Sequence, residues 1–82
     1  MIQKNNINYI KNLDHLVVDA ILLLKQEPKT DLEIVAAIPG FKLDMLGKLV
    51  DDGVIEHYGH LVYLSSLGDS IAASLSRLMK FL

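Results

Sequence analysis

Apolar residues recur at helical spacing in four stretches of this chain, which predicts four helices. The first stretch, residues 13–27, is apolar on most sides of a helical wheel and ends at Pro28, which disfavours helical geometry in the residue before it. The second, residues 31–38, opens with Thr30 and Glu33 at the spacing of a capping box. The third and fourth stretches each have an apolar face and cover residues 42–52 and 67–81.

Between the third and fourth helices the pattern changes to the alternation of β-strands. Gly53 follows the third helix and suits the left-handed conformation that ends many helices. Gly59 lies between two short apolar runs, where a hairpin turn needs a residue with positive φ. The sequence therefore predicts strands over residues 54–57 and 60–64. If Val62 and Leu64 face the core, the alternation makes Leu61 and Tyr63 face outward.

The predicted third helix has two unlike sides. The apolar side, which we expect to be buried, consists of Leu43, Met45, Leu46, Leu49 and Val50. The polar side, which can face a partner, offers Asp44, Gly47, Lys48, Asp51 and Asp52. Pro39 and Gly40 separate this helix from the one before it, as in a helix-turn-helix.

The run Leu49-Val-Asp-Asp-Gly-Val-Ile55, the glycine hairpin, Val62-Tyr-Leu-Ser65 and Gly68 together resemble the winged helix-turn-helix family, in particular the small MarR-, ArsR- and PadR-like regulators. The resemblance covers residues 13–82 and implies an α+β, mostly helical fold. That fold has a three-helix core, a two-stranded wing and a C-terminal helix. Residues 1–12 are polar and rich in asparagine, and form either an N-terminal arm or an extension of the first helix.

The resemblance implies a DNA-binding transcriptional regulator that acts on double-stranded DNA in the cytoplasm, as a homodimer. In this interpretation the third helix is the recognition helix and the hairpin is the wing. The residues expected at the DNA are Lys29, Phe41, Lys42, Asp44 and Lys48, with His57, Tyr58 and His60 in the wing.

Charge favours a different partner. The chain has ten acidic and eight basic residues, a net charge of −2, whereas nucleic-acid binders are usually basic. The polar side of the third helix carries none of the Arg, Asn or Gln side chains that commonly contact base edges, and the predicted wing tip has no Lys or Arg. The alternative hypothesis is therefore a winged-helix module that binds protein and not DNA.

The last helix has a second possible use. Ser66 and Asp69 have the spacing of a helix N-cap with an acid in the first turn. Further along, one stripe has the spacing of a coiled-coil seam, and we expect a dimerisation helix over residues 67–82 through Ile71, Leu75, Leu78 and Leu82. The alternative is that the stripe packs on its own domain. Hydrophobic residues make up 51% of the chain, which favours an additional interface.

Composition argues against several other functions. The chain has no cysteine, no glycine-rich phosphate loop and no His-Glu metal motif, so we expect neither an enzyme nor a cofactor. His57 and His60, with Glu56, could begin a zinc site, but nothing in the sequence completes the ligand set, and we predict no metal. The longest apolar run, residues 16–24, is interrupted by Asp19 and is too short to span a bilayer, so we expect no membrane contact.

Overall fold

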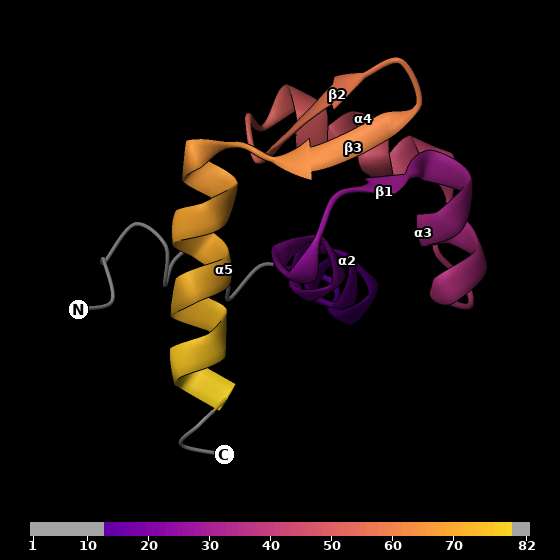
Figure 1. Cartoon of the computed structure of the whole chain (residues 1–82). Helices are drawn as coiled ribbons and strands as arrows, with labels where there is room; N and C mark the ends of the chain where they lie inside the picture. The colour runs from indigo at the N-terminus through magenta and orange to yellow at the C-terminus, as the bar shows by residue number, and fades with distance from the viewer. Residues whose placement is uncertain (1–12, 80–82) are drawn as a thin grey trace.

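Four helices and a three-stranded antiparallel sheet make up residues 13–79, the part of the chain that the computed structural model describes (Figure 1). The fold is α+β and mostly helical, with 62% helix, which confirms the predicted class. In chain order the elements are α2 (His15–Gln26), β1 (Lys29–Thr30), α3 (Asp31–Ala37), α4 (Leu43–Asp51), β2 (Ile55–Tyr58), β3 (Leu61–Leu64) and α5 (Ser66–Met79). The predicted arm over residues 1–12 and the predicted contact at Leu82 lie outside the described residues.

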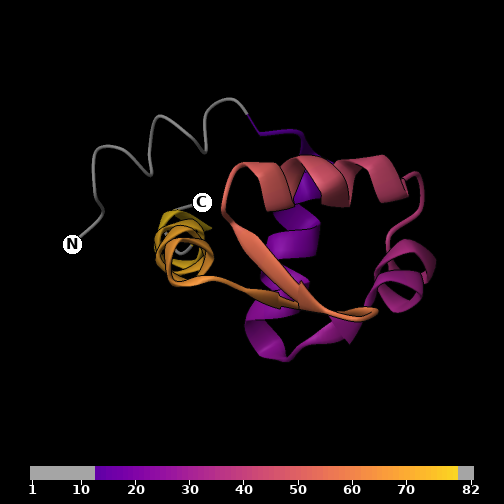
Figure 2. The same cartoon turned by 90° about the horizontal axis from the view of Figure 1, so that it is seen from above.

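Helix α2 occupies the middle of the domain. Helix α5 crosses it on one side, α3 lies on the other side, and α4 and the sheet lie over it (Figures 1 and 2). None of the helices within residues 13–79 is long and apolar enough to cross a membrane.

The sheet has the order β1-β3-β2, and its hairpin is tight. Tyr58 pairs with Leu61, so only Gly59 and His60 form the loop, and Gly59 has a φ of 61°. Glycine with positive φ at the first loop position is typical of a type II′ turn, whose twist matches that of the strands. The pairing of β1 with β3 was not predicted, because a strand of two residues has no alternation that a sequence could reveal.

The core is one cluster to which every helix and the hairpin contribute. Its largest fully buried side chains are Ile21, Ile34, Leu49, Val54, Ile55 and Ile71. In β3 the predicted alternation is confirmed only for the first two residues, because Val62 is buried and Leu61 is exposed, whereas Tyr63 and Leu64 are both half-buried. In α4 the predicted burial of the apolar side is partly wrong, because Leu43, expected on that side, is 53% exposed.

The turn between α3 and α4 corrects one predicted contact. Gly40 has a φ of 88°, and the Phe41 backbone N–H donates to the Ile38 carbonyl (3.1 Å). This turn directs the Phe41 side chain into the core, where it is only 3% exposed. The expectation that Phe41 lies beside DNA is therefore wrong.

Ser65 links the start of α5 by hydrogen bonds to the segment between α4 and β2. The Ser65 Oγ accepts a hydrogen bond from the Gly68 backbone N–H (3.0 Å), so Ser65, and not Ser66 as predicted, caps the helix. The same Oγ lies 2.9 Å from the Val54 carbonyl oxygen, and the Ser65 N–H donates to that oxygen at 3.0 Å. These bonds fix α5 to the first residues of the hairpin.

Two of the four residues expected in a dimer seam belong to the core of the single domain. Ile71 is 1% exposed and Leu75 is 4% exposed, because the face of α5 that carries them packs against α2. Leu78 is half-buried. The side chains of Ile71 and Leu75 are therefore not available to a second copy, which favours the alternative that the stripe packs on its own domain. Dimerisation through other residues stays a prediction.

Candidate functional site

Backbone hydrogen bonds at the C-terminal end of α4 fix the direction in which the chain enters the hairpin. Gly53, with a φ of 77°, donates from its N–H to the Val50 carbonyl, and Val54 donates to the Leu49 carbonyl, both at 3.0 Å. This pair of bonds is a Schellman motif, in which glycine takes the left-handed position after the helix. The chain leaves α4 at a fixed angle as a result, and the hairpin returns beside α4 (Figure 2).

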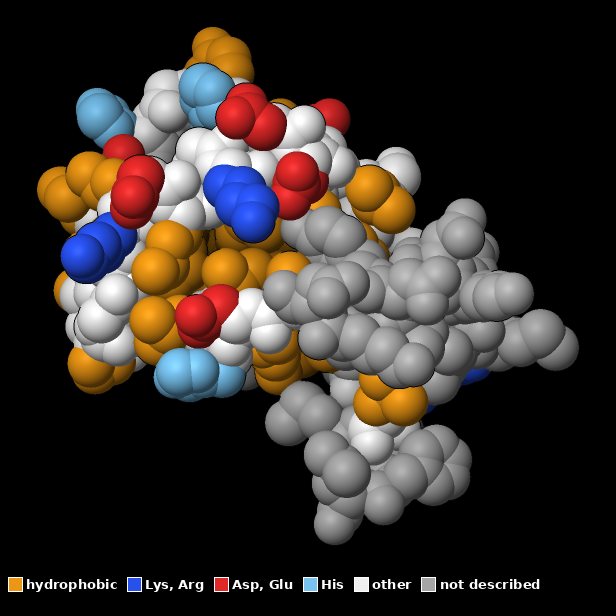
Figure 3. Space-filling model, turned by 180° about the vertical axis from the view of Figure 1, so that it is seen from behind, with side chains coloured by type: hydrophobic (Ala, Val, Ile, Leu, Met, Phe, Trp, Pro, Cys, Tyr) orange, Lys and Arg blue, Asp and Glu red, His pale blue; other side chains and the backbone are white. Residues whose placement is uncertain are grey.

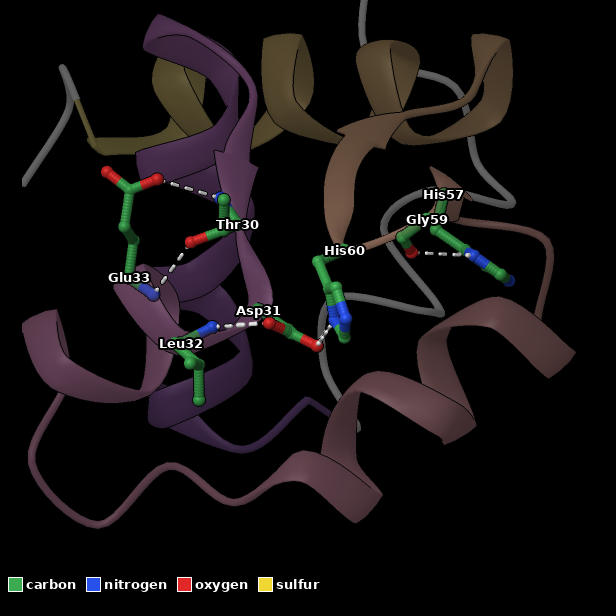
Figure 4. A network of polar contacts seen from close by, with 7 residues as sticks. All are labelled: Thr30, Asp31, Leu32, Glu33, His57, Gly59 and His60. Atoms are coloured by element: carbon green, nitrogen blue, oxygen red, sulfur yellow. Dashed lines mark hydrogen bonds and ion pairs between the residues drawn. The ribbon is translucent and has the colours of Figure 1, made fainter.

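The loop of the hairpin is bound to the first turn of α3 (Figure 4). The Asp31 backbone N–H donates to the His60 carbonyl (3.0 Å), and His60 Nδ1 lies 3.1 Å from Asp31 Oδ2. On the other side of the loop, His57 Nδ1 lies 3.3 Å from the Gly59 carbonyl oxygen. The two histidines thus have separate partners, and no three His, Cys, Asp or Glu side chains come together as a metal-binding group within residues 13–79.

Between α4 and the hairpin lies a shallow hollow of about 370 Å³, which we call the α4–hairpin hollow. Its apolar part includes Leu43 and Val50, which are 53% and 38% exposed. The remaining lining comes from Leu46 and Gly47 of α4, from Asp31 of α3, and from Ile55, His57, Gly59, His60 and Val62. Asp31 is the one carboxylate among these residues, and no lysine or arginine is among them.

A second cavity, of about 290 Å³, lies on the opposite flank of α4. Its apolar lining joins Leu13 and Val17 to Met45 and Leu49, and its charged lining comes from Asp14, Lys48 and Asp52. Helix α4 is therefore a ridge between two hollows, and Lys48 belongs to the flank away from the hairpin.

The outward side of α4 has two acidic residues, Asp44 and Asp51, and one basic residue, Lys48, which is four residues after Asp44. At 100° per residue, Asp44 and Asp51 lie nearly opposite the buried Leu46 and Leu49, and both aspartates are exposed. The face of the molecule on the α4 side shows more acidic than basic side chains around hydrophobic ones (Figure 3). A phosphate backbone against this face would lie near more carboxylates than ammonium groups.

The lysines on and around this face have different surroundings. Lys29 Nζ bonds Glu27 Oε1 at 2.6 Å, and this hydrogen bond raises the pKa of Lys29. Lys25 Nζ bonds Ser76 Oγ at 2.7 Å, on the α5 side of α2. Lys42 and Lys48 are exposed at α4, and their contact with DNA stays a prediction.

In the hairpin, the structure places the expected residues on two faces. His57 and His60 line the α4–hairpin hollow, whereas Tyr58, which is 83% exposed, pairs across the hairpin with Leu61. Sequence reasoning missed Asp31 as a member of the site, because the capping box already accounted for it as the first residue of a helix. It also missed the exposure of Leu43 and Val50, which the helical wheel placed on the apolar side.

Comparisons of the chain with models of protein families, with curated proteins and with solved structures give no match. The face formed by α4 and the hairpin is therefore the main structural indication of function.

The contact between Asp31 and His60 gives a prediction for acid solution. The hydrogen bond from His60, followed by the Leu32 N–H bond to the carboxylate, lowers the pKa of Asp31. A carboxyl whose pKa is lower in the folded state stabilises the fold above its unfolded pKa, about 3.9, and loses that contribution as pH falls through the folded value. We therefore expect Asp31→Asn to flatten the loss of stability below about pH 4 in urea denaturation at a series of pH values.

His60→Ala is the matched variant, because it removes the main cause of the lowered pKa and leaves the carboxylate. It should flatten the acid limb in the same way. Acid limbs that run parallel in the parent and both variants would contradict the assigned role of the pair.

Proposed function

We propose that this chain is a winged-helix domain that works as a protein-binding module, with α4 and the hairpin as its binding face. The order of helices, the turn at Gly40 and the tight hairpin beside α4 support the winged-helix assignment. One observation favours a protein partner. The α4–hairpin hollow has exposed Leu43 and Val50 in it, and the carboxylates of Asp44 and Asp51 flank it on α4.

Exposed apolar side chains in a hollow are typical of protein-binding surfaces, since their burial provides most of the affinity. Phosphate contacts make a different demand, because they need lysine and arginine along the face. The face has Lys42 and Lys48, and Lys48 lies on the far flank of α4. DNA binding, which the family resemblance implies, has the arrangement of elements in its favour and the charge against it.

Fluorescence anisotropy of a mixed-sequence duplex DNA, at low and at physiological salt, tests this proposal. We expect no binding in physiological salt and at most weak binding in low salt. Tight binding that weakens steeply with salt, and that is lost in the double variant Lys42→Glu and Lys48→Glu, would overturn the proposal in favour of a DNA-binding regulator.

The complementary measurement is selection of binders from a random peptide display library on the immobilised protein. We expect recovered peptides to lose binding to Leu43→Asp and to keep it for Leu67→Asp, which changes an exposed leucine on α5. Peptides that bind both variants equally would place the binding surface elsewhere.

A further inference from the structure

Gly47 has no evident role in folding. It lies in the middle of α4 with ordinary helical geometry, and a Cβ added to it would meet nothing within 4 Å. Glycine in the interior of an exposed helix is less stable than alanine, because it loses more backbone entropy on folding. The chain therefore carries a helix-weakening residue that neither a turn nor a close internal contact requires.

The position of Gly47 on the surface of α4 suggests a role in binding. It lines the α4–hairpin hollow between Leu43 and Val50, so these three residues follow one another at i, i+4 and i+7 along one stripe of α4. Two exposed apolar side chains with a glycine between them form a stripe with a notch at its centre. Such a notch lets another backbone approach the helix closely.

The charges around the stripe indicate the sign of the partner. Asp31, which is held by His60, lies at the hairpin side of the hollow, and Asp44 and Asp51 lie on the outward side of α4. Negative groups thus flank the stripe on both sides, and one exposed lysine, Lys42, directly precedes Leu43. Lys48 lines the cavity on the other flank of α4.

We infer that the α4–hairpin hollow binds a basic amphipathic helix of a partner protein, whose backbone crosses α4 closely at Gly47. The apolar side of that helix would cover Leu43 and Val50, and its lysines or arginines would lie beside Asp31, Asp44 and Asp51. This inference rests on the proposed function and names the chemistry of the partner. Helix-in-groove recognition of this kind uses apolar anchors at helical spacing for affinity and charge for specificity.

Two designed helical peptides with the same leucine and alanine seam test the inference, one with lysine and one with glutamate at every flanking position. Binding to the ¹⁵N-labelled protein is followed by NMR titration. We expect the lysine peptide to shift the amides of Gly47 and Val50 and of the hairpin loop, and to bind at least about tenfold more tightly than the glutamate peptide. Equal binding of the two peptides, or no shift in the hollow, would overturn the inference.

A substitution at the notch separates a binding role from a structural one. Gly47→Gln should keep the helix, as judged by circular dichroism. It should weaken binding of the lysine peptide by at least about tenfold, because the glutamine side chain fills the notch. Ala73→Gln, at an exposed position of α5, is the control and should bind as the parent does. Unchanged affinity of the lysine peptide for Gly47→Gln would overturn the inferred close approach of the partner backbone to α4.

The proposed function can fail independently of this inference. Salt-dependent binding of duplex DNA would overturn the protein-binding proposal even if the lysine peptide bound. A glutamate peptide that bound more tightly in the hollow would leave a protein-binding module but with a partner of the opposite charge.

Discussion

Leu75→Asp is expected to leave the chain unfolded at 25 °C and not to produce a folded monomer. Leu75 is 4% exposed on the side of α5 that packs against α2, so the new carboxylate would lie in the core without a partner. Burial of an unpaired charge costs several kcal/mol even after structural relaxation, and loss of a buried leucine side chain costs about 2–5 kcal/mol more. The sum is comparable to the stability of about 4–12 kcal/mol that is typical of a chain of 82 residues. Circular dichroism at 222 nm and the dispersion of the proton NMR spectrum measure the outcome.

Leu67→Asp is the matched control on the same helix. Leu67 is 46% exposed in the first turn of α5, where a negative charge interacts favourably with the helix dipole. This variant should remain folded, within about 0.5 kcal/mol of the parent. A well-folded Leu75→Asp that sediments as a monomer would contradict the core position of Leu75 and restore the predicted dimer seam.

The comparison of Leu75 with Leu67 shows what a helical stripe can and cannot predict. The stripe in the sequence identifies the apolar face of α5, and the burial of Ile71 and Leu75 agrees with it. It does not say whether that face meets the same domain or another copy, because both packings need the same spacing. Only the position of α2 beside α5 decides between the two.

Elements with a local chemical signal were predicted to within one or two residues. Thr30 and Glu33 form the expected capping box, with the Glu33 N–H to Thr30 Oγ1 bond at 3.2 Å and the return bond at 3.0 Å. Gly53 and Gly59 take the positive φ expected of them. These features need only neighbours in the chain, so the sequence is sufficient to predict them.

Features that depend on distant neighbours were predicted less well. Phe41 follows a turn and has no periodic pattern to mark it as buried, and the two-residue strand β1 exists because β3 is beside it. Leu43 belongs to the apolar side of α4 on a helical wheel, yet it extends beyond the core into the α4–hairpin hollow. The helical pattern therefore assigned part of the proposed binding face to the core.

The interior of the domain is also packed against one glycine that no turn requires. Gly68 lies in the first turn of α5, and a Cβ added there would meet the Val54 carbonyl oxygen and, at 3.1 Å, both the Val54 carbonyl carbon and Leu64 Cδ2. The oxygen belongs to the backbone and accepts the Ser65 N–H bond at 3.0 Å, so it cannot move without breaking the junction between α5 and the hairpin. The absence of a side chain at Gly68 allows this close approach.

Gly68→Ala is therefore expected to lower the free energy of unfolding by about 3 kcal/mol, the upper part of the range for overpacked sites, because the contact is with backbone. Gly47→Ala is the matched control, since it makes the same substitution in a helix where the added Cβ meets nothing within 4 Å. It should raise the free energy of unfolding by about 1 kcal/mol through helix propensity alone. Urea denaturation followed at 222 nm measures both. Equal effects of the two substitutions, or a stabilised Gly68→Ala, would contradict the close packing of α5 on Val54.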